Sequence, residues 1–143
     1  NMRYKKSIHK NKPEHKKICD SLRLQKNYFD WVGFYWMNDV DQTLELGAFS
    51  GSNTEHTLIP YGKGICGQVA ISGKIIEVPN IHEASNYIAC SLKTNSELVV
   101  PIYKNEKLIG QLDIDSHSIN PFNLSDKALL EKICESVADD IMP

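Results

Sequence analysis

Apolar residues recur at helical spacing in three parts of the chain. Near the start, Ile18, Cys19 and Leu22 lie on one face of a predicted helix over residues 13–25. A second helix is predicted over residues 65–72, directly after a turn that contains two glycines. The last helix would begin at an Asn123 or Ser125 cap, and its apolar stripe comprises Leu129, Ile133 and Val137 together with Leu130, Cys134 and Ala138.

Segments rich in aromatic and β-branched residues, separated by turn residues, predict strands. Six such strands are predicted, at residues 31–37, 43–50, 57–59, 74–78, 97–104 and 107–116. The first two and the last two form antiparallel hairpins. Because side chains alternate along a strand, Trp31, Gly33 and Tyr35 share one face, and Asp113 and Asp115 share another. A gap at Gly33 between two aromatic rings can be core packing or the wall of a pocket.

This order of elements predicts an α+β sandwich, with a mostly antiparallel sheet and the two terminal helices packed on one side of it. With 143 residues, the chain is long enough to bury roughly two thirds of the surface that its unfolded form exposes. We expect one domain over residues 13–143, preceded by a basic tail over residues 1–12. The segment 80–95 has no strand pattern, and irregular segments of that length inside a domain often serve function.

Charge is distributed unevenly along the chain. Seven basic residues and one acid precede residue 18, which leaves nine basic and seventeen acidic residues in the remainder. An acidic body argues against nucleic acid as a partner, and the basic tail is expected to be a solvated terminus. No apolar run approaches the ~20 residues that span a bilayer, and the lysine-rich start lacks a secretory signal. We therefore expect no membrane association and a cytoplasmic location, where cysteines are usually reduced or redox-active.

The four cysteines fall into two classes. Cys19 and Cys134 lie on apolar helix faces, which predicts core packing. Cys66 and Cys90 lie in unlike contexts, Gly64-Ile65-Cys66-Gly67 and Ile88-Ala89-Cys90-Ser91. Cys66 would occupy the first turn of its helix, where the helix dipole favours a thiolate.

Three interpretations of Cys66 and Cys90 remain open from spacing alone. They can bind a metal with His56 or His82, although no CxxC or HxxxH pairing supports this. They can also be inert buried thiols, or a redox pair in which one thiolate attacks and the other resolves the product. A phosphate-binding role for the glycine-containing turn is disfavoured, because it matches neither a P-loop nor a dinucleotide fingerprint.

Three acidic residues follow Cys66 and Cys90 in the sequence. Asp113 and Asp115 lie two residues apart, so burial would raise the pKa of at least one carboxyl. If both were ionised inside a pocket they would require a cation, such as a ligand ammonium or a metal. The alternative is that they lie in water at a strand end. Glu97, which begins its strand, is either solvated as well or a desolvated proton donor.

The chain resembles the free methionine-(R)-sulfoxide reductases, a catalytic branch of the GAF domains, over about residues 28–142. The motifs that carry the resemblance are Trp31-Val32-Gly33-Phe34-Tyr35, Ile59-Pro60-Tyr61-Gly62-Lys63-Gly64-Ile65-Cys66-Gly67, Tyr87-Ile88-Ala89-Cys90, Ser96-Glu97-Leu98-Val99-Val100-Pro101 and Leu112-Asp113-Ile114-Asp115-Ser116. The resemblance implies a GAF fold, in which a central antiparallel sheet is flanked by helices.

The resemblance also implies roles for individual residues. Cys90 would be the nucleophile, and Trp31 and Tyr35 would line the pocket. The remaining substrate-binding residues would be Tyr87, Ile88, Ala89, Glu97, Asp113 and Asp115. The acids would then bind the ammonium of free methionine sulfoxide, which a methionine inside a protein lacks. Backbone N–H groups around residues 88–90 would hold the sulfoxide oxygen.

The implied mechanism uses an external reductant and no bound cofactor or metal. Cys90 would attack the sulfoxide sulfur while Glu97 donates a proton, and Cys90 would become a sulfenic acid. Many family members carry a resolving cysteine ten residues before the position of Cys66, where this chain has His56. The chain thus resembles the subset without that residue, and a Cys66–Cys90 disulfide reduced by thioredoxin or a similar protein would complete the cycle.

A second interpretation makes the chain a non-catalytic GAF module that senses a small molecule or mediates dimerisation. The signature of cyclic-nucleotide GAF domains is not apparent in the sequence. The sequence leaves the oligomeric state open, a homodimer included.

Overall fold

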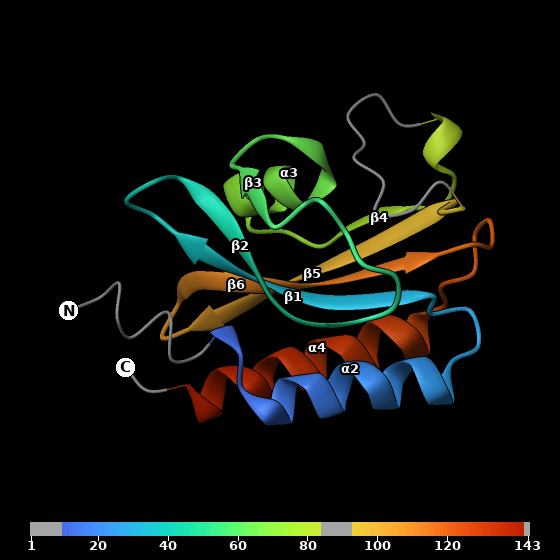
Figure 1. The fold of residues 1–143 in the computed structure, drawn as a ribbon, viewed down its shortest axis with the longest axis horizontal. Coiled ribbons are helices and arrows are strands. Elements are labelled where there is room, and N and C mark those ends of the chain that lie inside the picture. The colour runs from blue at the N-terminus through green and yellow to red at the C-terminus, as the bar shows by residue number, and fades with distance from the viewer. Residues whose placement is uncertain (1–9, 84–92, 142–143) are drawn as a thin grey trace.

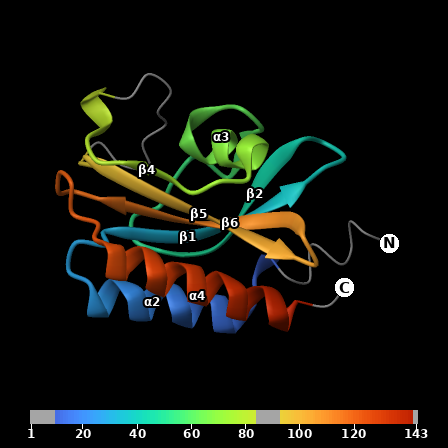
Figure 2. The same cartoon turned by 180° about the vertical axis from the view of Figure 1, so that it is seen from behind.

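The computed structural model describes residues 10–83 and 93–141, which form a sheet covered by helices on both faces (Figure 1). Helices α2 (Pro13–Gln25) and α4 (Leu124–Asp140) lie side by side on one face, and α3 (Gly64–Ser72) covers the other (Figures 1 and 2). Within the described ranges, no helix is long and apolar enough to cross a membrane.

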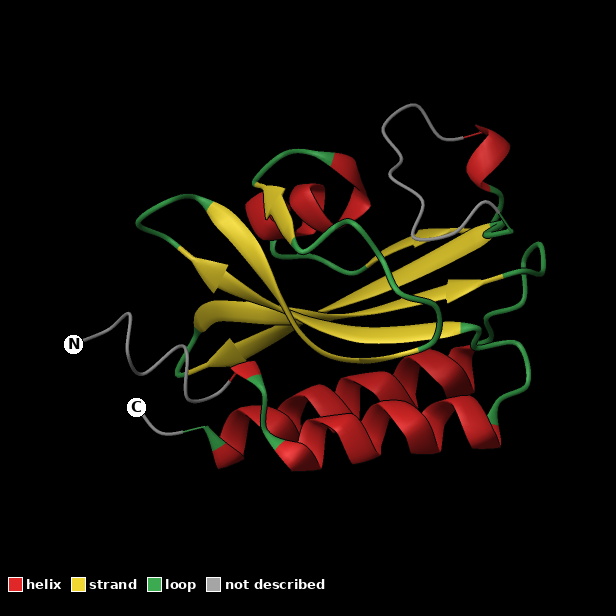
Figure 3. Cartoon of the chain, in the orientation of Figure 1, coloured by secondary structure: helices red, strands yellow, loops and turns green. Residues whose placement is uncertain are grey.

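The sheet has six strands in the order β3-β2-β1-β6-β5-β4, and every neighbouring pair is antiparallel (Figure 3). The strands are β1 (Trp31–Asn38), β2 (Thr43–Ser50), β3 (Leu58–Pro60), β4 (Ile76–Val78), β5 (Ser96–Lys104) and β6 (Lys107–Ser116), and a short 3-10 helix, η1 (Ile81–Glu83), follows β4. Both predicted hairpins are confirmed. The two short edge strands are also present, each shifted or shortened by one or two residues.

Alternation along the strands divides the interior into two cores. Val32, Phe34 and Trp36 point toward α2 and α4, together with the buried apolar residues of that helix pair. Trp31 and Tyr35 point to the opposite face, where α3 packs. Cys19 and Cys134 are buried in the first core, which confirms their predicted role in packing.

The start of α4 is fixed by a capping box. The Asn123 side chain accepts from the backbone N–H of Asp126, and the Asp126 carboxylate accepts from the backbone N–H of Asn123. Asn123, and not Ser125, is therefore the cap. Buried Asp126 also accepts from the Tyr28 hydroxyl at 2.8 Å and pairs with Lys26 at 3.2 Å, so the cap joins α4 to the segment between α2 and β1.

Gly33 on β1 is required by close packing. A Cβ atom at this position would lie 2.3 Å from Cη2 of the Trp31 ring. The predicted gap at Gly33 is therefore filled by the ring of Trp31. Gly33 also lies opposite Asp113 in the β1–β6 register, which brings the aromatic face of β1 next to the acids of β6.

Stability should depend on the core beneath α4. Leu130 is 0% exposed on α4, whereas Leu24 is 87% exposed on α2. We expect Leu130→Ala to lower the free energy of unfolding by about 2–5 kcal/mol through lost burial and a cavity. Leu24→Ala should change it by less than about 0.5 kcal/mol. Urea unfolding followed by circular dichroism measures both values, and equal effects would contradict the assigned packing.

Candidate active site

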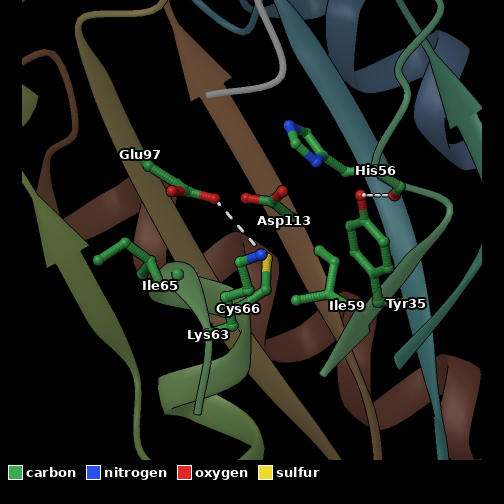
Figure 4. A pocket seen from close by; sticks show the side chains of 9 residues that line it. Tyr35, His56, Ile59, Lys63, Ile65, Cys66, Glu97 and Asp113 are labelled. Atoms are coloured by element: carbon green, nitrogen blue, oxygen red, sulfur yellow. Dashed lines mark hydrogen bonds between the residues drawn. The ribbon is translucent and has the colours of Figure 1, made fainter. Parts of the chain in front are cut away.

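A pocket lies between α3 and the sheet, on the face opposite α2 and α4 (Figure 4). Residues from β1, the loop before β3, β3 itself, the start of α3, and strands β5 and β6 converge on it. They are Tyr35, His56, Ile59, Lys63, Gly64, Ile65, Cys66, Glu97 and Asp113.

Sheet register brings the three acids together. Glu97 on β5 is paired with Asp115 on β6, and Asp115 is paired in turn with Trp31 on β1. Asp113 lies two residues from Asp115 on the same face. Glu97 is 2% exposed, and Asp113 and Asp115 are each 1% exposed, so the alternative of strand ends in water is wrong.

The thiol of Cys66 lies among these carboxyls. Its Sγ donates to Oε2 of Glu97 at 3.7 Å. One ligand atom from each of Cys66, Glu97 and Asp113 lies within 4.8 Å of the other two. Figure 4 shows Glu97 and Asp113 reaching from adjacent strands toward the helix that carries Cys66. The pocket therefore combines a thiol with two buried carboxyl groups.

The backbone around Cys66 fixes where its sulfur lies. Cys66 is the third residue of α3, in the first turn as predicted. The N–H of Gly62 donates to the carbonyl of Gly67 at 2.8 Å, which closes the turn that leads into the helix. The buried amide of Gln111 on β6 donates to the Cys66 carbonyl at 3.1 Å. These bonds tie the start of α3 to the sheet beside the acids.

Burial and mutual repulsion favour the protonated acids. Burial raises the pKa of Glu97 well above its usual value, and the negative charges of Asp113 and Asp115 raise it further. Burial also raises the pKa of Asp113, partly offset by polar contacts with Glu97 and Cys66.

No basic side chain among the described residues forms an ion pair with Glu97 or Asp113. Within the same ranges, Oε1 of Glu97 and both carboxyl oxygens of Asp113 have no hydrogen-bond partner. The pocket therefore holds buried acceptor atoms that a bound cation or donor would satisfy.

The aromatic residues of β1 differ in position. Tyr35 lines the pocket, and its hydroxyl donates to the backbone carbonyl of His56 at 2.8 Å. Trp31 lies behind this wall, where its ring stacks on Phe49 at 5.6 Å and its indole N–H donates to the Ser52 carbonyl at 3.0 Å. Trp31 is not among the described pocket-lining residues.

The histidines of the proposed metal set separate in the structure. His56, the residue for which the resemblance implied a resolving cysteine in many family members, lines the pocket. His82 lies on η1 with its Nε2 3.2 Å from Asn95 Oδ1, outside the described pocket lining. The metal alternative joined Cys66 and Cys90 with His56 or His82. Cys90 lies outside the described residues, and within them neither histidine belongs to the group of ligand atoms that converges on Cys66.

Four predicted residues, Tyr87, Ile88, Ala89 and Cys90, lie outside the described residues. The roles of Cys90 as nucleophile and of its neighbours in substrate binding stay predictions.

The pocket includes residues that the sequence did not single out as site residues. Lys63, Ile59 and Ile65 line it, and Gln111 supports it from below. Lys63 precedes α3 in the motif that carries Cys66, so proximity to the thiol was a usable signal. Gln111 lies on the same strand face as Asp113 and Asp115, a third polar residue at period two on a buried strand.

Comparisons with known proteins agree with this fold. The model of the family described as "GAF domain" matches residues 17–141. The free methionine-R-sulfoxide reductase of Saccharomyces cerevisiae is 37% identical over 76% of this chain and 61% of its own length. The corresponding reductase of Escherichia coli is 35% identical over 73% of this chain and 61% of its own length. The chain thus spans less than two thirds of these two relatives.

Solved structures match over more of their length. The type II free methionine-R-sulfoxide reductase of Thermoplasma acidophilum superposes with a TM-score of 0.86 and 31% identity, covering 94% of this chain and 93% of that one. The reductase of Neisseria meningitidis, solved in complex with its substrate, gives a TM-score of 0.83 at 29% identity, covering 94% and 82%. The chain therefore belongs to the GAF-domain family, in the branch of the free methionine-(R)-sulfoxide reductases.

Proposed function

We propose that this protein is an oxidoreductase that reduces free methionine-(R)-sulfoxide to methionine, with Cys90 as nucleophile and Cys66 as resolving thiol. The observation that carries the proposal is the buried pair Glu97 and Asp113 beside the Cys66 thiol. It occurs in a chain that is similar over nearly its whole length to proteins with that activity.

The acids account for the selection of a free amino acid. Buried carboxylates without a basic partner are unfavourable unless a cation enters with the ligand. The ammonium of free methionine sulfoxide supplies that charge, whereas a methionine within a polypeptide has a neutral amide there. The same argument excludes N-acylated substrates.

Lys63 supplies the complementary charge. It lines the pocket from its exposed rim, and no acid in the described ranges pairs with it. A substrate that carries an ammonium and a carboxylate would be bound at both ends, by the acids and by Lys63. This pairing extends the selection to the carboxyl end of the substrate.

Reduction begins with the thiolate of Cys90 attacking the sulfoxide sulfur. The departing oxygen needs a proton, and Glu97 is suited to donate it because burial and the neighbouring acids raise its pKa and so favour its protonated form. The protonated oxygen then moves from the methionine sulfur to the Cys90 sulfur as the sulfur–sulfur bond of the adduct breaks, so methionine leaves and Cys90 is a sulfenic acid.

Recycling requires a second thiol, and we assign that step to Cys66. Its sulfur lies inside the pocket, in contact with the proposed proton donor. Condensation of the Cys66 thiol with the Cys90 sulfenic acid forms a disulfide and releases water. A dithiol reductant such as thioredoxin then reduces the disulfide, so no bound cofactor or metal is needed. We place this cycle in the cytoplasm, where such reductants act.

Serine substitutions separate the two thiol roles. Cys90→Ser should abolish formation of methionine, with at least a 10³-fold loss. Cys66→Ser should release about one methionine per chain and then stop, because the sulfenic acid is not resolved. Cys134→Ala, which removes a core thiol, is the matched control and should keep steady turnover.

The measurement for these variants is a thioredoxin-coupled NADPH assay with single-turnover quantification of methionine. Many turnovers by Cys66→Ser would refute its resolving role, and an active Cys90→Ser would refute the nucleophile. If wild type binds the sulfoxide at equilibrium without turnover in this assay, the sensing alternative replaces the reductase.

Substrate analogues test the charges at both ends. N-acetyl-methionine sulfoxide should lose about 10²-fold or more in kcat/KM, because the acids lose their cation. Lys63→Met should lower kcat/KM about tenfold for the free amino acid and leave the methyl ester of the sulfoxide unaffected. Preferential reduction of peptide-bound sulfoxide would contradict the argument.

Glu97 should make both activity and stability decline as pH rises. Glu97→Gln should lower kcat by about 10²–10⁴ and abolish the decline of activity at high pH that deprotonation of Glu97 causes. Because folding raises the pKa of Glu97, the folded state binds this proton more tightly than the unfolded chain does. The contribution of Glu97 to the free energy of unfolding therefore falls as the pH rises above the pKa that Glu97 has in the unfolded chain.

Glu97→Gln should therefore raise the melting temperature by roughly 2–4 °C at pH 8, and less at pH 5. The exposed Glu131→Gln on α4 is the control and should change neither property. If Glu97→Gln instead melts at a lower temperature than wild type at pH 8, the carboxylate is stabilised in the folded chain.

A further inference from the structure

The pocket groups that the proposed reaction uses are also a donor set for a metal ion. Within the described residues, Cys66, Glu97 and Asp113 are the group of acids, histidines and cysteines whose ligand atoms converge, all within 4.8 Å of one another. All three are buried. They come from separate elements, α3, β5 and β6, so the arrangement is made by the tertiary fold.

The geometry fits a tetrahedral ion. Zinc–sulfur and zinc–oxygen bonds of about 2.3 and 2.0 Å at a tetrahedral angle place the two ligand atoms about 3.5 Å apart. Sγ of Cys66 lies 3.7 Å from Oε2 of Glu97. Cys66 and Glu97 therefore need to approach each other only slightly to bind the same ion, and Asp113 supplies the third ligand.

The unpartnered atoms point to a cation as the missing partner. Oε1 of Glu97 and both oxygens of Asp113 are buried and have no hydrogen-bond partner in the described ranges. One thiolate with two carboxylates is a ligand combination that suits zinc and similar transition metals better than Mg²⁺ or Ca²⁺, which prefer oxygen alone. Three protein ligands leave the fourth position for water, as in open zinc sites.

We propose that Cys66, Glu97 and Asp113 bind a divalent transition-metal ion such as Zn²⁺, and that the ion excludes substrate from the same pocket. Metal binding follows from the donor set alone, whereas the competition rests on the proposed function. A bound ion would also hold Cys66 as a metal thiolate and keep it from forming the resolving disulfide. Zinc would thus act as a reversible inhibitor that protects the thiol from oxidation.

Binding should release protons. The Cys66 thiol and the Glu97 carboxyl must both give up a proton to coordinate the ion, so affinity should rise with pH. Lys63 is not one of the three ligands, and its exposed charge is screened by solvent. Lys63→Met should therefore change zinc affinity by less than about threefold, although it should weaken binding of the free amino acid.

The first experiment measures metal binding without turnover, on the reduced full chain. Co²⁺ should bind one per chain with the charge-transfer absorption of a cobalt thiolate, and Zn²⁺ should displace it. Cys66→Ser should abolish that absorption, and Asp113→Asn should weaken Zn²⁺ binding about 100-fold or more. Circular dichroism verifies that the variants are folded. Cys134→Ala is the control and should bind as wild type does.

Two results would overturn the inference. One is a cobalt-thiolate signal that survives Cys66→Ser and disappears in Cys90→Ser. The other is binding with the same affinity in wild type and Asp113→Asn, which would mean an adventitious ion only.

The second experiment measures competition in the reductase assay with dithiothreitol-free thioredoxin. Zn²⁺ should raise KM for the free sulfoxide without lowering kcat, and a chelator should reverse the effect. Inhibition that lowers kcat alone would contradict a shared pocket. A chain that shows the Cys66-dependent cobalt signal but no reductase activity would support the metal site and refute the proposed function.

Discussion

The structure depends on one electrostatic constraint: Glu97 and Asp113 are buried, and no basic side chain among the described residues forms an ion pair with them. Antiparallel register sets Glu97 against Asp115, and alternation along β6 adds Asp113 on the same face. Desolvation and mutual repulsion both destabilise the ionised carboxyl groups in this arrangement, and they raise the pKa of Glu97. The acids are therefore better explained as a site than as a stabilising feature.

Stability comes from the opposite face of the same strands. Phe34, Trp36 and Leu112 alternate with the pocket residues along β1 and β6 and pack beneath α2 and α4. A pocket with destabilising buried acids can persist because it shares its strands with a well-packed core. This division also explains why Cys134, in the core beneath α2 and α4, has a packing role, whereas Cys66 lies on the pocket face.

The sequence predicted the elements and faces well because those follow from local periodicity. Both hairpins, the three helices and the shared face of Asp113 and Asp115 required only spacing. Burial of the acids was not predictable in this way, since it depends on α3 closing over the sheet through the turn at Gly62 and the Gln111 bond to Cys66. Lys63 was missed for a related reason. A lysine before a helix is usually solvated, and only the tertiary fold turns it into a pocket residue.

The same charge imbalance admits three different occupants, and they differ in what they require of Cys66. A proton on Glu97 neutralises the pocket and leaves the thiol free, a substrate ammonium does so and brings the sulfoxide with it, and a divalent ion takes the thiol as a ligand. In the proposed reaction the first two occur together, because Glu97 keeps its proton until it donates it to the bound sulfoxide, whereas the third would stop the reaction. On these two proposals, the pocket that selects the substrate ammonium is also the one that a divalent ion would occupy.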